Sequence, residues 1–276
     1  MSGPARVLVD GTCAETVSVF DRGLSYGDGL FETIRFMGGD APLWSRHMAR
    51  LRESGERLRL PIPDASLLLH EALVVADGLD QAVVRITVTR GLGERGYAPP
   101  VLPQPMRIVA AFAAAAMAGD AYVHGIRLRW CEIRLALQPL LAGMKHLNRL
   151  EQVLARAEWS DASFADGLLC DTDGHVIAST MANLFAVIDG ELVTPSVAYC
   201  GVAGVARAEI LACHATVHVG DISRKDLLGA EEVFLSSSVR GILPVQAVDD
   251  TVYVPGPVTR DLQRHWRGLG FPMEQA

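Results

Sequence analysis

Along the first part of the chain, segments with the hydrophobic period of a strand alternate with segments that have the period of a helix. This alternation restricts the fold class of the chain more than any other feature of the sequence. Strands are predicted at residues 5–11, 30–36, 82–91 and 106–114, and helices at 44–60 and 65–75. Because the two kinds of element are interspersed and not grouped into separate halves, we expect an α+β fold.

A run of small residues that ends in Gly-Asp predicts a division into two domains. We expect an N-terminal lobe at 1–113, a linker at 114–124 and a C-terminal lobe at 125–276. In the second lobe the pattern predicts strands in GIRLRWCEIR, GLLCDT, HVIAS and NLFAVIDG, a helix after Gly204, and EEVFLSSS as the last strand. A helix from Asn148 to about Trp159 is also expected, with a capping box formed by Asn148 and Glu151.

Composition and charge exclude several classes of protein. A net charge of -7 without a basic stripe argues against a nucleic-acid partner. The longest apolar stretch, at 108–118, is too short and too rich in alanine to span a membrane, and no leader opens the chain, so we expect a cytoplasmic protein. Five scattered cysteines without a C-x-x-C pair, and no histidine at ligand spacing, predict reduced thiols and no metal site.

Lysine is rare in this chain, which makes each lysine informative. Of 25 basic residues, only Lys145 and Lys225 are lysines. Arginine stays protonated and forms no imine at neutral pH, whereas lysine can act as a nucleophile, a base or a covalent partner of a carbonyl. Lys145 lies in AGMKHLNRL just before a predicted helix, and it is therefore a candidate catalytic residue. The alternative is an ordinary surface lysine.

Four separated motifs carry a family resemblance: DRGLSYGDGLFETIR (21–35), TRGLGERGYAPP (89–100), KHLNRLEQVLARAEW (145–159) and GVAGVARAEIL (201–211). The chain resembles the fold-type IV pyridoxal-phosphate enzymes, which share the D-amino-acid aminotransferase-like fold and include aminotransferases and aminodeoxychorismate lyases. The second and third motifs are most similar to the lyases. The resemblance implies two lobes with pyridoxal 5'-phosphate between them, Lys145 joined covalently to the cofactor, and a homodimer.

Several residues are candidates for the phosphate of that cofactor. A glycine-rich turn precedes a helix whose first amides include Val205 and Ala206, and exposed N–H groups at a helix start bind anions. Taken alone, Arg50 would be a solvated arginine and Ser238 part of a capped strand end. The resemblance implies that Arg50, Val205, Ala206 and Ser238 together hold the phosphate.

The resemblance also implies a substrate side of the site. Arg95 and Tyr97 match positions that hold a substrate carboxylate in relatives, and Phe31 stands where D-amino-acid aminotransferases have tyrosine. Arg35 and Arg240 are further candidates for carboxylate contacts, with surface or interface ion pairs as the alternative. An arginine fork suits a planar carboxylate.

One position departs from the family pattern. The glutamate that normally faces the pyridine nitrogen falls on Ala178, and no acid lies nearby in IASTMAN. The hydroxyl of Ser179 or Thr180, or water, is then expected at the ring nitrogen. A neutral hydroxyl cannot keep the ring protonated as a carboxylate does, so the cofactor should be a weaker electron sink.

A weaker sink favours elimination, because aromatisation of the product drives that reaction. We therefore expect conversion of 4-amino-4-deoxychorismate, a small molecule with two carboxylates, to 4-aminobenzoate and pyruvate for folate synthesis. Two alternatives stay open. One is a D-amino-acid or branched-chain aminotransferase of the same fold, and the other is a cofactor-binding homologue whose catalysis is weakened by Ala178.

Overall fold

The computed structural model describes residues 6–114 and 119–273, which divide into two compact units. The first unit is Met1–Ala115 with Met144–Asn148, and the second is Ala116–Gly143 with Arg149–Ala276. Within the predicted linker, residues 115–118 lie outside the described residues, and Gly119–Val123 forms helix α4.

The segment around Lys145 does not belong with the lobe predicted at 125–276. Met144–Asn148 groups with the first unit, because its backbone pairs with strand β3 (Gly29–Met37). The N–H of Phe31 donates to the Lys145 carbonyl at 2.9 Å, and the N–H of Leu147 donates to the Gly29 carbonyl at 3.0 Å. Hydrophobic periodicity could not predict this assignment, because it says nothing about which strand edge a short extended segment joins.

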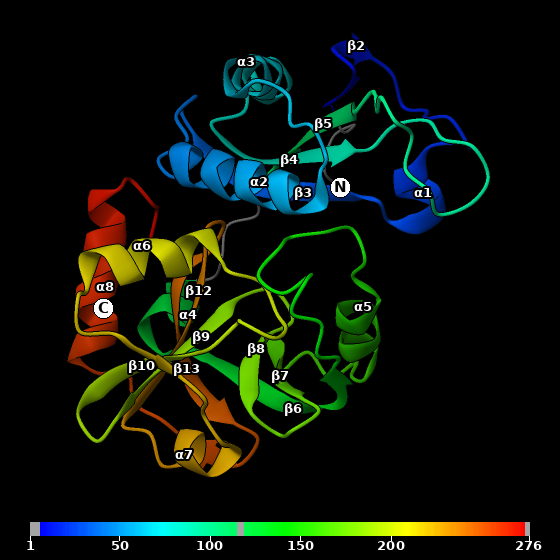
Figure 1. Ribbon diagram of the computed structural model, residues 1–276. Helices are drawn as coiled ribbons and strands as arrows, with labels where there is room; N and C mark the ends of the chain where they lie inside the picture. The colour runs from blue at the N-terminus through cyan, green and yellow to red at the C-terminus, as the bar shows by residue number, and fades with distance from the viewer. Residues whose placement is uncertain (1–5, 115–118, 274–276) are drawn as a thin grey trace. The chain divides into compact units, whose positions relative to one another are not determined.

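The first unit contains an antiparallel five-stranded sheet with the order β2-β1-β5-β4-β3. Its other strands are β1 (Arg6–Val9), β2 (Thr12–Cys13), β4 (Gln81–Thr89) and β5 (Met106–Ala113). Helices α2 (Trp44–Leu58) and α3 (Ala65–Ala76) pack on the sheet, and the short α1 (Arg22–Tyr26) precedes β3 (Figure 1). Every second residue of β3 and β4 is fully buried beneath the helices, which matches the period of two.

Helix α2 ends two residues earlier than predicted. Arg59 adopts a left-handed conformation (φ 51°) and caps the helix, and Pro61 follows. A proline lacks the N–H that continued helix would need and disfavours helical backbone in the residue before it, so the chain turns here.

The second unit contains a nine-stranded mixed sheet with the order β11-β10-β9-β12-β13-β6-β7-β8, with β14 added to β13. Strand β8 also pairs with β9, so part of the sheet closes on itself. The strands are β6 (Ile126–Leu135), β7 (Asp166–Asp171), β8 (Val176–Ser179), β9 (Asn183–Ile188), β10 (Glu191–Pro195), β11 (His218–Gly220), β12 (Glu232–Ser237), β13 (Gly241–Val248) and β14 (Thr251–Val252). The remaining helices are α5 (Leu150–Ala157), α6 (Val205–Cys213), α7 (Arg224–Leu228) and α8 (Pro257–Gly268).

Helices α6 and α8 lie side by side in the second unit (Figure 1), joined by His265 Nε2 and Glu209 Oε1 at 2.9 Å. The prediction that EEVFLSSS is the last strand was wrong, because β13, β14 and α8 follow it. Gly241 and Pro244 interrupt the alternation of apolar and polar residues that would have indicated a strand at β13. Strand β13 is buried because α8 packs against it.

The predicted capping box at α5 was also wrong. The cap residue is Arg149, which makes no side-chain capping bond. Asn148 instead donates to the Gly27 carbonyl at 3.2 Å, and Glu151 accepts from the Ala136 N–H at 2.8 Å. Both side chains are used in tertiary contacts that a local spacing rule does not contain.

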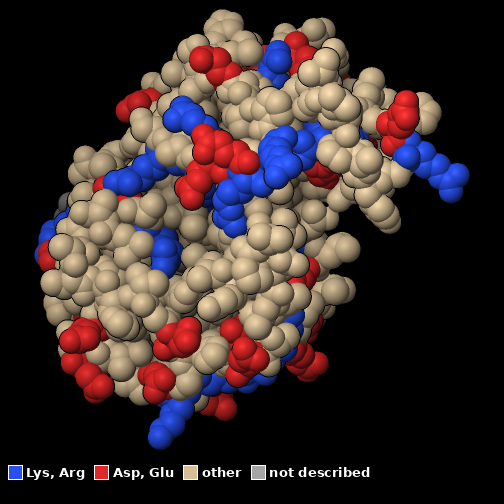
Figure 2. Space-filling view, viewed as in Figure 1, with Lys and Arg blue, Asp and Glu red and all other residues tan. Residues whose placement is uncertain are grey.

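Among the described residues, no helix is both long enough and apolar enough to cross a membrane. On the face seen in Figure 2, acidic side chains interrupt the basic ones, so this face carries no continuous basic stripe.

Candidate active site

The predicted site residues are divided between the two units. The first unit contains Phe31, Arg35, Arg50, Arg95, Tyr97 and Lys145. The second contains Ser179, Thr180, Val205, Ala206, Ser238 and Arg240. Each set forms its own local arrangement within its unit.

Lys145 lies against an aromatic ring of the first unit. Its Nζ is 4.3 Å from the centroid of the Phe31 ring, a distance at which an ammonium and a π face attract each other. Pairing of the 144–148 segment with β3 sets this contact. The catalytic candidate is therefore held by the backbone on one side and by Phe31 on the other.

Arg85 approaches the same ring, and sequence analysis missed it. Its guanidinium carbon is 4.2 Å from the Phe31 centroid. Arg85 lies on β4 opposite Thr33, and a period of two along β4 would have indicated that it shares a sheet face with Phe31. Burial lowers the pKa of Arg85. Two cations around one ring make this a place suited to an anionic ligand.

Arg50 is not a solvated arginine. Its Nε donates to Glu32 Oε1 at 2.8 Å, and its Nη2 bonds the other carboxylate oxygen of Glu32. His47 Nδ1 lies 2.6 Å from Glu32 Oε2, and neither Glu32 nor His47 is more than 1% exposed. The Glu32 carboxylate thus fixes the direction of Arg50. Sequence analysis missed this triad, although position 47 precedes 50 by about one helical turn.

The charges of this triad follow from its surroundings. Burial acts to raise the pKa of Glu32, but the charge of Arg50 and the bond from His47 outweigh it and lower that pKa to about 2. Burial holds the pKa of His47 below its ordinary value. A neutral ring whose Nδ1–H donates to an ionised carboxylate leaves Nε2 as an acceptor. Within residues 6–114 and 119–273 this buried Nε2 has no hydrogen-bond partner.

The other arginines of the first unit differ in exposure. Arg35 is buried, and its Nη2 donates to Gln81 Oε1. Arg95 and Tyr97 lie on the loop between β4 and β5, where both are exposed and Tyr97 retains 85% of its accessible surface. The Tyr97 ring contacts that of Tyr26, with ring centroids 5.4 Å apart.

In the second unit, helix α6 begins at Val205, as predicted. Its cap residue Gly204 has no side chain and therefore makes no side-chain capping bond to the first N–H groups. A Cβ on Gly204 would lie 2.0 Å from Asn183 Oδ1, which explains the glycine. Asn183 in turn donates to the Val202 carbonyl at 2.9 Å and so fixes the turn that precedes the helix.

The end of β12 meets this helix start. Ser236 lies opposite Asn183 in the β9–β12 ladder, and its buried Oγ has no partner among the residues the structure describes. Ser238 follows directly after the strand. An uncapped helix start and an unsatisfied buried hydroxyl are polar groups that a phosphate would satisfy, so these residues fit the phosphorylated cofactor.

A buried acid lies close to Thr180 after all. The Thr180 hydroxyl donates to Asp166 Oδ1 at 2.5 Å, and the N–H groups of Gly167 and Thr180 bond the same oxygen at 2.8 and 3.2 Å. Asp166 is 2% exposed. It begins β7, whose pairing with β8 brings together residues 14 positions apart, so a search of the local sequence could not find it.

This pair changes the expectation for the ring nitrogen. A hydroxyl that gives its proton to a carboxylate presents only acceptor positions elsewhere, so Thr180 is suited to accept an N–H. Ser179 is less suited, because its Oγ is used in a turn with the backbone of Ala182 at 3.0 and 3.3 Å. Ala178 itself packs in an apolar cluster with Leu169 and Trp159.

The α+β fold is that of the fold-type IV pyridoxal-phosphate enzymes, as predicted. The family model for class IV amino-transferases matches residues 29–248, and the chain belongs to this family.

Individual relatives narrow the comparison. Aminodeoxychorismate lyase of Vibrio harveyi is 38% identical over 92% of this chain and 97% of its own length. The crystal structure of 4-amino-4-deoxychorismate lyase from Pseudomonas aeruginosa superimposes with a TM-score of 0.90 at 47% identity, over 95% of this chain and 98% of that one. A putative branched-chain-amino-acid aminotransferase of Methanocaldococcus jannaschii is 32% identical over 92% of this chain and 91% of its own length.

Proposed function

We propose that this chain is a cytoplasmic, pyridoxal-phosphate-dependent lyase that converts 4-amino-4-deoxychorismate to 4-aminobenzoate and pyruvate. The observation that carries this proposal is the likeness to two lyases at 38% and 47% identity over almost the whole of each chain. The aminotransferase relative is less similar, at 32%.

In this proposal, each part of the cofactor would have a partner among the predicted site residues. Lys145 would join its aldehyde carbon, while Arg50, the first amides of α6 and Ser238 would meet its phosphate. The Thr180 hydroxyl, backed by Asp166, would accept the ring N–H. When bound, the cofactor supplies an electron sink for the bond that breaks.

Lys145 carries the proton transfers in this proposal. Once the substrate amine has displaced Nζ from the cofactor, the freed Nζ would take the proton from carbon 4 of the substrate and return a proton to the departing enolpyruvyl group, which becomes pyruvate. Loss of that group leaves an aromatic ring. The two substrate carboxylates need cations or hydrogen-bond donors. Our first candidates are the guanidinium groups of Arg85 and Arg95 and the hydroxyl of Tyr97, followed by Arg35 and Arg240.

The direct test is pyruvate release from enzymatically generated 4-amino-4-deoxychorismate, followed through NADH oxidation by lactate dehydrogenase. We expect equal amounts of pyruvate and 4-aminobenzoate from the wild-type protein. Protein that is loaded with cofactor and releases neither product would contradict the proposal and favour a homologue without catalysis.

Transamination is the second candidate, favoured by the 32% identity to a putative aminotransferase. It predicts that an amino acid converts the cofactor to its amine form, with loss of the visible absorbance, and that a keto acid restores it. The lyase should perform this half-reaction slowly, because Ala178 stands at the position of the family's glutamate and supplies no carboxylate to the ring nitrogen.

Substitution Ala178→Glu should raise the rate of that half-reaction at least about tenfold and change pyruvate release little, since a carboxylate keeps the ring protonated. Stopped-flow absorbance would measure the rate. Ala178→Gln has the same shape without the charge and is the matched control. An equal gain in both variants would show that ring protonation is not the cause.

A homodimer is supported by the surface of α5. Leu150, Val153 and Leu154 share one face of this helix and are 74%, 59% and 58% exposed, although a period of three to four normally marks a buried face. The wild-type protein should behave as twice its chain mass of 29.7 kDa in light scattering.

Replacing Leu154 with glutamate should shift the protein to the monomer, because a charge would be buried in an apolar contact. The matched control is Val252→Glu, which changes a valine on β14 that is 72% exposed and should leave the mass unchanged. A wild-type monomer would rule out this interface.

A further inference from the structure

The loop that carries Arg95 and Tyr97 cannot hold one conformation by itself. Its residues 91–98 include Gly91, Gly93 and Gly96, and both Arg95 and Tyr97 are exposed. Ordering a residue of a flexible loop costs on the order of 1–2 kcal/mol, and no buried apolar side chain of this loop offsets that cost. Other residues must therefore hold it.

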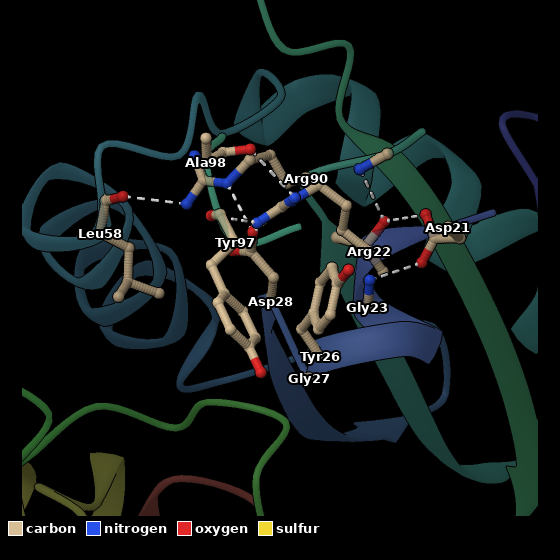
Figure 3. A network of polar contacts seen from close by, with 12 residues as sticks. Asp21, Arg22, Gly23, Tyr26, Gly27, Asp28, Leu58, Arg90, Tyr97 and Ala98 are labelled. Atoms are coloured by element: carbon tan, nitrogen blue, oxygen red, sulfur yellow. Dashed lines mark hydrogen bonds and ion pairs between the residues drawn. The ribbon is translucent and has the colours of Figure 1, made fainter. Parts of the chain in front are cut away.

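Arg22 makes the contacts at the tip of the loop (Figure 3). Its Nη1 donates to the carbonyls of Gly96 and Ala98 at 3.1 and 3.2 Å, and its Nη2 donates to the Tyr97 carbonyl at 3.0 Å. Three successive carbonyls thus turn toward one guanidinium. Arg22 is 4% exposed. Glycine at position 93 leaves room for the aliphatic part of the Arg22 side chain, because a Cβ there would lie 2.6 Å from Arg22 Cδ.

Asp28 anchors this guanidinium from the other side. Arg22 Nε and Arg90 Nε donate to the same oxygen, Asp28 Oδ2, at 2.9 and 2.8 Å. Burial acts to raise the pKa of Asp28, but the hydrogen bonds and charges of Arg90 and Arg22 outweigh it and hold that pKa below its ordinary value. Arg90 then donates to the carbonyls of Arg59 and Leu58 at 2.8 and 3.0 Å, at the end of α2.

Tyr26 completes the support. Its hydroxyl accepts from the Gly96 N–H at 3.1 Å, and its ring centroid lies 5.4 Å from that of Tyr97 and 4.9 Å from the guanidinium carbon of Arg22. The base of the loop is tied separately, by the Arg22 N–H to the Gly91 carbonyl at 2.9 Å. The Arg22 side chain therefore determines the conformation of the loop tip. Its bonds to the Gly96 and Ala98 carbonyls hold the backbone on both sides of Tyr97.

We propose that Arg22 is a positioning residue for the substrate: it fixes the carbonyls of 96–98 and so presents Arg95 and Tyr97 in one arrangement. The inference rests on the proposed function, in which Arg95 and Tyr97 meet a substrate carboxylate. Arg22 itself need not touch the substrate. It links the DRGLSYGDG and RGLGERGY motifs, whose connection the sequence does not reveal.

The test is Arg22→Lys in the full-length protein loaded with cofactor. Lysine keeps a charge beside Asp28 but lacks the fork that reaches three carbonyls. We expect KM for 4-amino-4-deoxychorismate to rise about tenfold, which corresponds to about 1.4 kcal/mol, with kcat within about threefold and an unchanged visible spectrum. An unchanged KM in the loaded variant would overturn the proposal.

Arg90→Lys is the matched control, because Arg90 shares Asp28 but holds the end of α2 instead of the loop. Its KM should stay within about threefold of the wild type. An equal rise of KM in both variants would assign the effect to general stability and reject positioning. Should Arg22→Lys fail to fold, Tyr26→Phe removes only the bond to Gly96 and should raise KM about fivefold, above the range allowed for the control. No rise beyond that range would count against the proposal.

Trypsin provides a readout that does not depend on the reaction. It cleaves after Arg95, and cleavage should be faster in Arg22→Lys than in wild type or Arg90→Lys, because the loop is released. Faster cleavage with an unchanged KM would mean that the loop is held but has no substrate role, which overturns the proposal. Wild-type protein without pyruvate release would reject the proposed function itself, and unchanged cleavage would reject the tether.

Discussion

Lys145→Arg should abolish pyruvate release, with a loss of at least about 10²–10⁴-fold, the usual contribution of a general base. The arginine keeps a positive charge near the Phe31 ring, which the lysine Nζ approaches to 4.3 Å. It can neither form the covalent bond to the cofactor nor give up a proton at neutral pH. The measurement is the coupled pyruvate assay on protein saturated with pyridoxal phosphate.

Lys225 is the matched control for this substitution. It is the second of the two lysines in the chain, and it lies exposed on α7. Lys225→Arg should keep the wild-type rate. Borohydride reduction followed by peptide mapping should place the reduced cofactor on Lys145. A mapped adduct on Lys225, or a Lys145→Arg variant at the wild-type rate, would end the proposal.

Glu32→Gln should destabilise the fold by about 3 kcal/mol at pH 7, because it leaves the positive charge of Arg50 without its buried partner. Glutamine preserves the shape of the side chain, so the loss is electrostatic and not a cavity. Urea unfolding would measure it. Asp261→Asn is the control: it breaks a pair with Arg264 whose side chains are 60% and 61% exposed, and it should change stability by less than about 1 kcal/mol.

The pH dependence of this effect has a definite sign. The folded-state pKa of Glu32 is about 2, below its ordinary 4.5, so its stabilisation is complete above pH 4.5 and is lost as the pH falls toward 2. The shift corresponds to about 3 kcal/mol. The stability gap between wild type and Glu32→Gln should therefore narrow from pH 5 to pH 3. A gap that stays constant would show that charge is not its source.

His47 acts in the same direction in the wild type. Its folded-state pKa lies below the ordinary 6.5, so the unfolded chain binds a proton more readily as the pH falls through 6.5. Stability should thus begin to fall near pH 6.5, before Glu32 titrates. The Glu32–His47–Arg50 triad makes the first unit acid-sensitive.

The sequence by itself was sufficient for the family and for most of the strands and helices. Alternating residues along β3 and β4 predicted strands because the period of two is a local property of extended chain. The scarcity of lysine singled out Lys145 because chemistry separates lysine from arginine at every position. Motif similarity then supplied the cofactor and the reaction class, and the family was confirmed.

Tertiary structure decided which groups act on one another. The Glu32–His47 contact, the Arg85–Phe31 contact and the Thr180–Asp166 bond each join residues on different elements. Likewise, Arg22 reaches carbonyls 74 to 76 positions away. Periodicity reports which face of an element is apolar, whereas hydrogen bonds of about 3 Å depend on how strands pair and helices pack. That is why the chemistry of single residues could be inferred from the sequence, and the partners that direct it could not.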